Sequence, residues 1–302
     1  MYRLIQKFFL YLLSLCSLRF LHILSNLLFH IFFSKRSKRY KVTRKNLDLC
    51  FPEKKEKWKE DLASNSLKEF LKSMIEAPHI WRVASKNKIT GSNKSNLNNL
   101  IKDVKGSTHI TEAIRKNNGI IFITPHHGSW ELSGLYVANN IETSIMYRPL
   151  RNKILDNFVK NGRASTGAKL VPTDGSGVKN LLKSLQNNNG VGVLPDHTPK
   201  LNQGIMSRFF DVPVNTITLI NKLSKKKKSP VLFVYSERLK RGKGFKIYIE
   251  EIVENFYNAG DQEAADILNR CLEDIILRNP EQYLWSYERF RNRVGVKENA
   301  YN

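Results

Sequence analysis

The chain has 302 residues, enough for one large α/β domain plus a terminal appendage, and its 41% hydrophobic content allows a sizeable core. The formal net charge of +23 favours an anionic partner: a phospholipid surface, a phosphorylated glycolipid, an acidic carrier protein or nucleic acid. Three scattered cysteines (Cys16, Cys50 and Cys271), with no CxxC pair, argue against a disulfide framework or a structural zinc site and suit a reducing cytosolic face.

The first apolar stretch, residues 8–33, consists mostly of Leu, Phe and Ile. It is longer than a secretory signal, and no small-residue cleavage site follows it. A single span needs about 20 mainly apolar residues, which this stretch provides. Two interpretations stay open: a spanning helix, or a helix lying in the interface with Arg19 extended towards the headgroups. We therefore expect residues 1–34 to form a membrane-anchoring helix and residues 35–302 to form the folded domain.

A basic cluster of seven Lys and Arg side chains follows at residues 35–45. Basic residues beside an apolar helix stay on the cytoplasmic side and attract anionic headgroups. The sequence therefore predicts a domain on the cytoplasmic face of a membrane, with an anionic membrane surface as a partner.

The central stretch of the chain is GIIFITPHHGSWELSGL, residues 119–135. Its apolar, β-branched run at residues 120–124 predicts a strand buried on both faces, and Pro125 ends it. A tight turn and the start of a helix follow. In open α/β sheets, ligands bind at the carboxyl ends of the strands, where this turn lies. The spacing between His126 and Glu131 does not place them on one helix face, but it lets a histidine in the turn meet a carboxylate in the first helical turn.

This pair of residue types suits proton transfer. A neutral imidazole can take a proton from a hydroxyl, and a carboxylate on its other ring nitrogen fixes the tautomer. We therefore predict His126 as a general base held by Glu131. The acceptor's own hydroxyl would then attack an activated acyl group, so no serine or cysteine nucleophile is needed. The alternative is that His126 and His127 are polar loop residues and Glu131 favours a helix N-terminus.

The rest of the chain alternates predicted strands and helices, which is typical of an α/β fold. Strands are expected at residues 142–147, 168–172, 190–194, 230–235 and 245–252, and helices at residues 55–76, 152–164, 177–187, from 215, and 262–277. Asp196 and His197 follow the strand at 190–194 and so face the same crevice as His126. Arg163 lies in the last turn of its helix, where it could serve the site or simply cap a helix C-terminus.

Four blocks of this sequence resemble, in order, the lipid A biosynthesis acyltransferases. PHHGSWE at residues 125–131 is similar to their HxxxxE signature; the related glycerolipid acyltransferases carry HxxxxD. The other blocks are CFPE at 50–53, PDH at 195–197 with Phe209 and Phe210 after it, and PEQYLW at 280–285. The resemblance covers residues 45–293.

The resemblance implies a glycerolipid-acyltransferase-like α/β fold, with a central, mostly parallel twisted sheet flanked by helices and an N-terminal membrane helix. It implies transfer of a fatty acyl chain from acyl carrier protein to a hydroxyl of a Kdo-bearing lipid A precursor in lipopolysaccharide biosynthesis, at the cytoplasmic face of the cell inner membrane. Acyl carrier protein would bring the co-substrate, and no metal or dissociable cofactor is expected. The implied catalytic residues are His126, Glu131 and Arg163, where Arg163 would brace the glutamate, hold a phosphate or stabilise an oxyanion. The implied substrate-binding residues are Arg148, Asp196, His197, Phe209, Phe210 and Arg289.

Two other functions stay open. One keeps the chemistry and changes the acceptor to a lysophospholipid or another glycolipid. The other is a non-catalytic basic protein that binds a membrane or nucleic acid. Nucleic-acid recognition predicts a known module or aromatic residues interleaved with the basic patch, and neither is found, so no nucleic-acid partner is expected. Phe209 and Phe210 would line an acyl channel or belong to the core.

Overall fold

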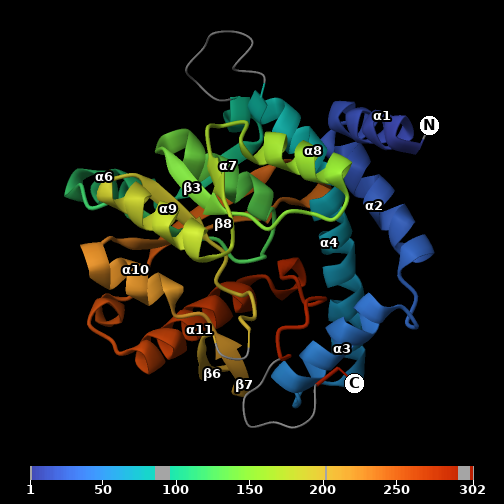
Figure 1. Cartoon of the computed structure of the whole chain (residues 1–302). Coiled ribbons are helices and arrows are strands. Elements are labelled where there is room, and N and C mark those ends of the chain that lie inside the picture. The colour runs from blue at the N-terminus through green and yellow to red at the C-terminus, as the bar shows by residue number, and fades with distance from the viewer. Residues whose placement is uncertain (1, 86–95, 201–202, 292–299, 302) are drawn as a thin grey trace.

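The computed structural model describes residues 2–85, 96–200, 203–291 and 300–301 (Figure 1). A seven-stranded sheet forms its centre, in the order β1 (Ile101–Lys105), β9 (Phe245–Glu251), β8 (Val231–Arg238), β2 (Ile120–Ile123), β5 (Gly190–Val193), β3 (Thr143–Met146) and β4 (Lys169–Val171). Neighbouring strands are parallel except β8 and β9, which are antiparallel. The prediction of an α/β fold with a mostly parallel sheet is therefore confirmed.

Alternate side chains of the central strands pack against helices on the two faces of the sheet. Ile121 and Ile123 of β2 join a large cluster that contains side chains of α9 (Gly175–Gln186), α10 (Leu219–Lys227) and α11 (Asp261–Arg278). Ile120 and Phe122 join another cluster, with α6 (Ser107–Lys116) and α7 (Trp130–Asn140). Because successive side chains of a strand point to opposite faces, a strand covered on both sides must be apolar throughout.

Some elements differ from the sequence prediction in their bounds or in their kind. The helix α4 (Glu56–Ser85) runs beyond residue 76 and contains Pro78. A hairpin of β6 (Ile205–Phe209) and β7 (Val212–Thr216) occupies the segment before α10. The predicted helix from residue 215 therefore begins only at α10, because residues 212–216 pair with 205–209. Two further α-helices are α3 (Lys38–Cys50) and α8 (Lys153–Arg163). Short 3-10 helices are η1 (Asn96–Asn99), η2 (Lys240–Gly242), η3 (Glu254–Tyr257) and η4 (Pro280–Gln282).

The expected N-terminal membrane helix is wrong. The segment forms two helices, α1 (Tyr2–Leu15) and α2 (Leu18–Phe32), and both contact α4 along one side of the molecule (Figure 1). Ser17 causes the break, because its backbone is extended and its side chain accepts a hydrogen bond from the Phe20 amide, which starts a new helix. In the described part of the chain, no helix combines the length and the apolar character needed to cross a bilayer.

Candidate active site

The turn that follows β2 is held by backbone hydrogen bonds to the C-terminal part of the chain. The Gly128 amide donates to the Gln282 carbonyl at 2.9 Å, and the Leu284 amide donates to the His126 carbonyl at 3.0 Å. Gly128 has a φ of +58°, and a Cβ there would lie 1.8 Å from the Ser236 carbonyl oxygen. The turn therefore requires glycine and has little room to shift.

His126 meets Asp196 across the carboxyl ends of two neighbouring strands. Asp196 Oδ1 lies 2.9 Å from His126 Nδ1, and Asp196 Oδ2 accepts the His126 backbone N–H, also at 2.9 Å. Ile123 of β2 is in register with Val193 of β5, and each functional residue lies three positions further on. Equal offsets from parallel, in-register strands bring the two side chains together.

The buried carboxylate sets the proton arrangement of the imidazole. Burial acts to raise the pKa of Asp196, but the charge and hydrogen bonds of His126 lower it below its usual range. Asp196 is therefore ionised near neutral pH, and a carboxylate only accepts hydrogen bonds. In the neutral form of the imidazole, Nδ1 of His126 accordingly carries the ring proton and Nε2 carries the free lone pair. The rings of His197 and Trp130 lie 4.9 Å and 5.4 Å from that of His126.

Glu131 pairs with Arg163 rather than with His126. Arg163 Nε donates to Glu131 Oε2 at 3.0 Å, and Arg163 Nη2 donates to Oε1 at 2.5 Å. Burial lowers the pKa of Arg163, but attraction by Glu131 outweighs it and raises that pKa. Within the described residues, no hydrogen bond joins Glu131 to His126, so the structure differs from the expected pair: the carboxylate on His126 is Asp196.

The two-pronged ion pair is placed by close packing of α8 on α4. A Cβ on Gly162 would lie 2.3 Å from the Trp81 ring, so glycine is needed where the helices meet. At the other end of α8, the Asn152 side chain accepts hydrogen bonds from the Ile154 and Leu155 amides. These contacts fix the position of α8 and present Arg163 to the first turn of α7.

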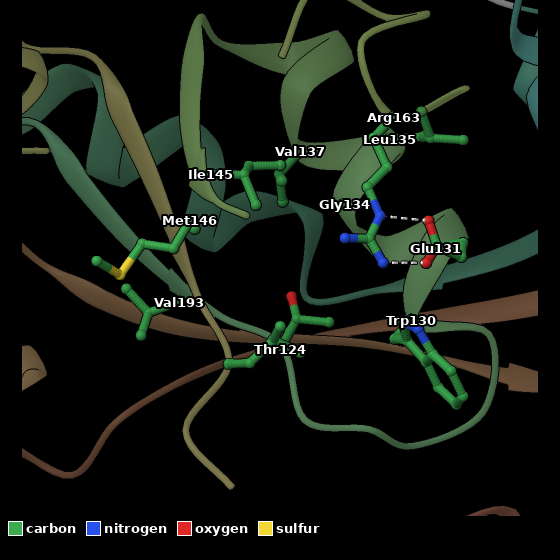
Figure 2. Close-up of a pocket in the computed structure, with 12 residues that line it drawn as sticks. Thr124, Trp130, Glu131, Gly134, Leu135, Val137, Ile145, Met146, Arg163 and Val193 are labelled. Carbon is green, nitrogen blue, oxygen red and sulfur yellow. Dashed lines mark hydrogen bonds and ion pairs between the residues drawn. The ribbon is translucent and has the colours of Figure 1, made fainter. Parts of the chain in front are cut away.

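An apolar cavity lies beside the Glu131–Arg163 pair (Figure 2). Its empty space amounts to about 540 Å³, a figure that includes open solvent. The Glu131 carboxylate and Arg163 guanidinium are its charged groups, and the guanidinium's Nη1 makes no hydrogen bond to any described residue. The residues around it are Thr124, Trp130, Glu131, Gly134, Leu135, Val137, Ile145, Met146, Arg163, Gly192, Val193 and Leu194. His126 is not among them, but Trp130 contacts both its ring and the cavity.

The other predicted substrate-binding residues lie away from this cavity. Arg148 is exposed beyond β3, whereas Phe209 and Arg289 are core residues with 1% and 2% exposure. Arg289 donates to the Asn215 carbonyl at 2.8 Å, and Phe210 packs against other aromatic rings. In the ranges that the structure describes, no three His, Cys, Asp or Glu side chains gather as a metal ion would require.

Sequence reasoning placed Asp196 in the crevice but missed its bond to His126. The available signal was the equal offset of the two residues from the ends of the strands predicted at residues 120–124 and 190–194. It also missed the cavity walls supplied by Trp130, Ile145 and Met146. Ile145 and Met146 are the last residues of β3, and apolar residues at the end of a strand normally predict packing in the core.

His127 is fully buried, and burial lowers its pKa despite partial opposition from Glu237. Its Nε2 lies 3.8 Å from Glu237 Oε1, too far for a hydrogen bond. The unfolded chain therefore binds a proton below about pH 6.5, where the folded protein resists it. We expect the free energy of unfolding to fall on acidification from that pH, by at most about 1.4 kcal/mol per pH unit for this one group.

The measurement is urea unfolding of the wild type and His127→Gln from pH 7.5 to 5. The variant should lose stability less steeply on acidification. Equal slopes would contradict a buried neutral His127. His30→Gln is the matched control, because His30 is exposed at the end of α2.

The chain resembles proteins of one bacterial enzyme family over nearly its whole length. Residues 3–292 match the family model described as bacterial lipid A biosynthesis acyltransferase. The chain is 24% identical to the lipid A biosynthesis palmitoleoyltransferase of Escherichia coli over 265 residues, covering 87% of this chain and 82% of that protein. It is also 24% identical to the Escherichia coli lauroyltransferase (86% and 81% covered) and 25% identical to a lipid A biosynthesis acyltransferase of Haemophilus influenzae (86% and 80%). The chain therefore belongs to the bacterial lipid A biosynthesis acyltransferase family, and it is an acyltransferase.

Proposed function

We propose that this protein transfers a fatty acyl chain from acyl carrier protein to a hydroxyl of a Kdo-bearing lipid A precursor, with His126 as general base. The observation that carries the proposal is the His126–Asp196 pair beside an apolar cavity with the Glu131–Arg163 ion pair in its wall. A base, a cationic donor and an apolar recess are the parts that acyl transfer to an alcohol needs.

The reaction begins at Nε2 of His126. This nitrogen takes the proton of the acceptor hydroxyl as the hydroxyl oxygen bonds to the thioester carbonyl carbon. Asp196 keeps the ring oriented through Nδ1 and stabilises the imidazolium that forms. The tetrahedral intermediate then collapses, the carbon–sulfur bond breaks, and the thiolate of the carrier's phosphopantetheine arm takes the proton from the imidazolium. The products are the ester and the free thiol.

Arg163 supplies the positive charge for the intermediate. Glu131 occupies its Nε and Nη2, which fixes the plane of the guanidinium and leaves Nη1 to donate to the oxyanion. A donor held in place before the reaction lowers the barrier because it does not reorganise as charge develops. In this proposal, the glutamate acts on the reaction through Arg163 rather than through His126.

The apolar cavity takes the acyl chain of the donor. Gly134 of α7 lies in its wall, and a Cβ there would be 3.8 Å from Ile145 Cδ1, an ordinary contact. A larger side chain at this position would occupy space that the end of the chain needs.

Gly134→Leu should therefore change the preference for acyl chain length. We expect the ratio of kcat/KM for a donor two carbons shorter, relative to the preferred donor, to rise roughly tenfold. Acyl carrier proteins charged with chains of defined length provide the measurement. Gly175→Leu is the matched control, since no atom of the described residues lies within 4 Å of a Cβ there. An unchanged preference in Gly134→Leu would place the chain elsewhere.

The outer surface of α1 and α2 suits a place on an anionic membrane. Both helices expose large apolar side chains, and basic residues 35–45 follow. A surface of this kind lies in the headgroup region without crossing the bilayer. It would hold the protein at the cytoplasmic face of the inner membrane, where we propose that the acceptor is presented. The exposed apolar residues are Ile5, Phe8, Phe9, Tyr11, Leu12, Leu15, Phe20, Ile23, Leu27, Ile31 and Phe32.

The experiment incubates the protein with acyl-charged carrier protein and separate acceptors: a Kdo-bearing lipid A precursor, the same lipid without Kdo, and a lysophospholipid. Mass spectrometry then detects the added acyl chain. Transfer to the Kdo-bearing lipid supports the proposal. Transfer only to the lysophospholipid, or transfer only from a donor other than carrier protein, would contradict it.

A further inference from the structure

A buried charged network lies directly behind the catalytic turn. Its centre is Arg238, the last residue of β8, whose side chain is 2% exposed. The guanidinium Nε donates to both oxygens of Glu76 at 2.8 Å and 2.9 Å, and Nη1 donates to Glu69 at 2.9 Å. Two carboxylates of α4 thus neutralise a cation inside the protein, which would be costly if it were unpaired.

The remaining nitrogen of Arg238 reaches the turn itself. Nη2 donates to the Gly128 carbonyl at 2.8 Å and to Ser73 Oγ at 2.6 Å. The Ser73 hydroxyl lies 3.2 Å from the same carbonyl and 3.1 Å from the Glu69 carbonyl, and it can donate its one proton to either. Gly128 lies between His126 and the helix start that carries Glu131. These contacts therefore hold the Gly128–Ser129 peptide group, which joins the turn at His126 to the first turn of α7.

The peptide groups around Arg238 extend this hold. The Arg238 amide donates to Gln282 Oε1 at 2.8 Å, and Gln282 Nε2 returns a bond to the Arg238 carbonyl at 3.0 Å. The Gln282 carbonyl in turn accepts the Gly128 amide. Gly128 is thus bound through its amide and its carbonyl by groups that themselves bond to one another.

We infer that Arg238 is a positioning residue for acyl transfer, which holds the Gly128 carbonyl so that His126 and Glu131 keep their alignment. This inference rests on the proposed role of His126. Misplacement of a base by a fraction of an ångström costs rate because the attack geometry is lost, while binding of the donor in the cavity is preserved.

The network also contacts the N-terminal helices. Glu76 Oε2 lies 2.8 Å from Nε2 of His22, a buried residue of α2. Glu76, which orients Arg238, therefore also bonds to α2, one of the two helices that carry the exposed apolar surface. Alignment of the turn thus depends on a group anchored to α2 as well as on α4.

The test compares Arg238→Lys and Ser73→Ala with Ile110→Ala. Lysine keeps a buried cation for Glu69 and Glu76 but lacks the fork that also reaches Gly128. Ser73→Ala leaves every charge pair in place and removes the hydroxyl beside the Gly128 carbonyl, so it is informative even where the lysine variant does not fold. Ile110, 4% exposed on α6, gives a destabilised control remote from the turn.

We expect kcat of Arg238→Lys to fall about tenfold or more, with KM for the donor within about twofold of the wild type. Ser73→Ala should show a smaller loss of the same kind. In histidine-labelled protein, the NMR resonance of the His126 Nδ1 proton should move in both variants and not in Ile110→Ala.

An unchanged kcat and an unmoved resonance in both variants would overturn the inference and leave Arg238 a structural ion-pair partner. Failure of the proposed function is seen separately, because it would appear as an active His126→Ala protein. The resonance still reports on alignment in that case.

Discussion

Replacing His126 by alanine should remove acyl transfer while leaving the fold in place. One ring nitrogen of the imidazole bonds to Asp196, and the other makes no hydrogen bond to any residue that the structure describes. The ring packs against Trp130 at the edge of the cavity. Loss of a general base typically costs about 10²–10⁴-fold in rate. We expect kcat to decrease by a factor in that range, or to drop below the detection limit. The assay uses carrier-bound donor and lipid acceptor.

The control for this variant is His30→Ala, which removes an exposed imidazole from α2. It should keep wild-type turnover, and both variants should keep the wild-type circular dichroism spectrum. Near-normal turnover of His126→Ala would show that another group accepts the proton. His127 has no free path to substrate for that role, since it is completely buried.

Asp196→Asn should produce the second large loss. An amide in place of the carboxylate offers the ring an N–H as readily as an oxygen, so the tautomer with a free Nε2 lone pair is no longer enforced. Asp196 also accepts the His126 backbone amide, so one substitution weakens two bonds to the same residue. We expect kcat to fall by about 10²–10⁴-fold, with KM little changed.

Glu131→Gln is the informative comparison. The structure predicts a smaller loss, because glutamine keeps an oxygen for Arg163 and leaves His126 with its own carboxylate. The sequence spacing alone predicts the opposite ranking, with Glu131 as the partner of the base. A greater loss in Glu131→Gln than in Asp196→Asn, measured in the same assay, would favour the pair expected from the sequence.

The parts of the fold that were predicted well have a signal contained within one short stretch of the sequence. The apolar runs of β2 and β5 end at Pro125 and Pro195, and the amphipathic helix predicted at 152–164 is α8 at Lys153–Arg163. Such signals depend on burial and on local turn chemistry. Convergence of His126 and Asp196 on one crevice followed from the same strands.

The parts that were not predicted depend on tertiary partners. A single N-terminal helix was expected from hydropathy, but Ser17 caps the start of a second helix. His22 of that helix is buried because it pairs with Glu76 of α4. The choice of Asp196 over Glu131 depends on strand register and on Arg163, which arrives from a separate helix. Neither partner can be read from the spacing within one motif.

The backbone bonds from Gln282 and Leu284 to the turn have a consequence for the timing of assembly. The segment that completes the turn is synthesised long after His126, the residue whose backbone it binds. Contacts so distant in sequence form late in folding, because a long loop must close first. A growing polypeptide therefore lacks an ordered turn at His126 until residues 282–284 have left the ribosome, and we expect a product truncated before them to show no acyl transfer.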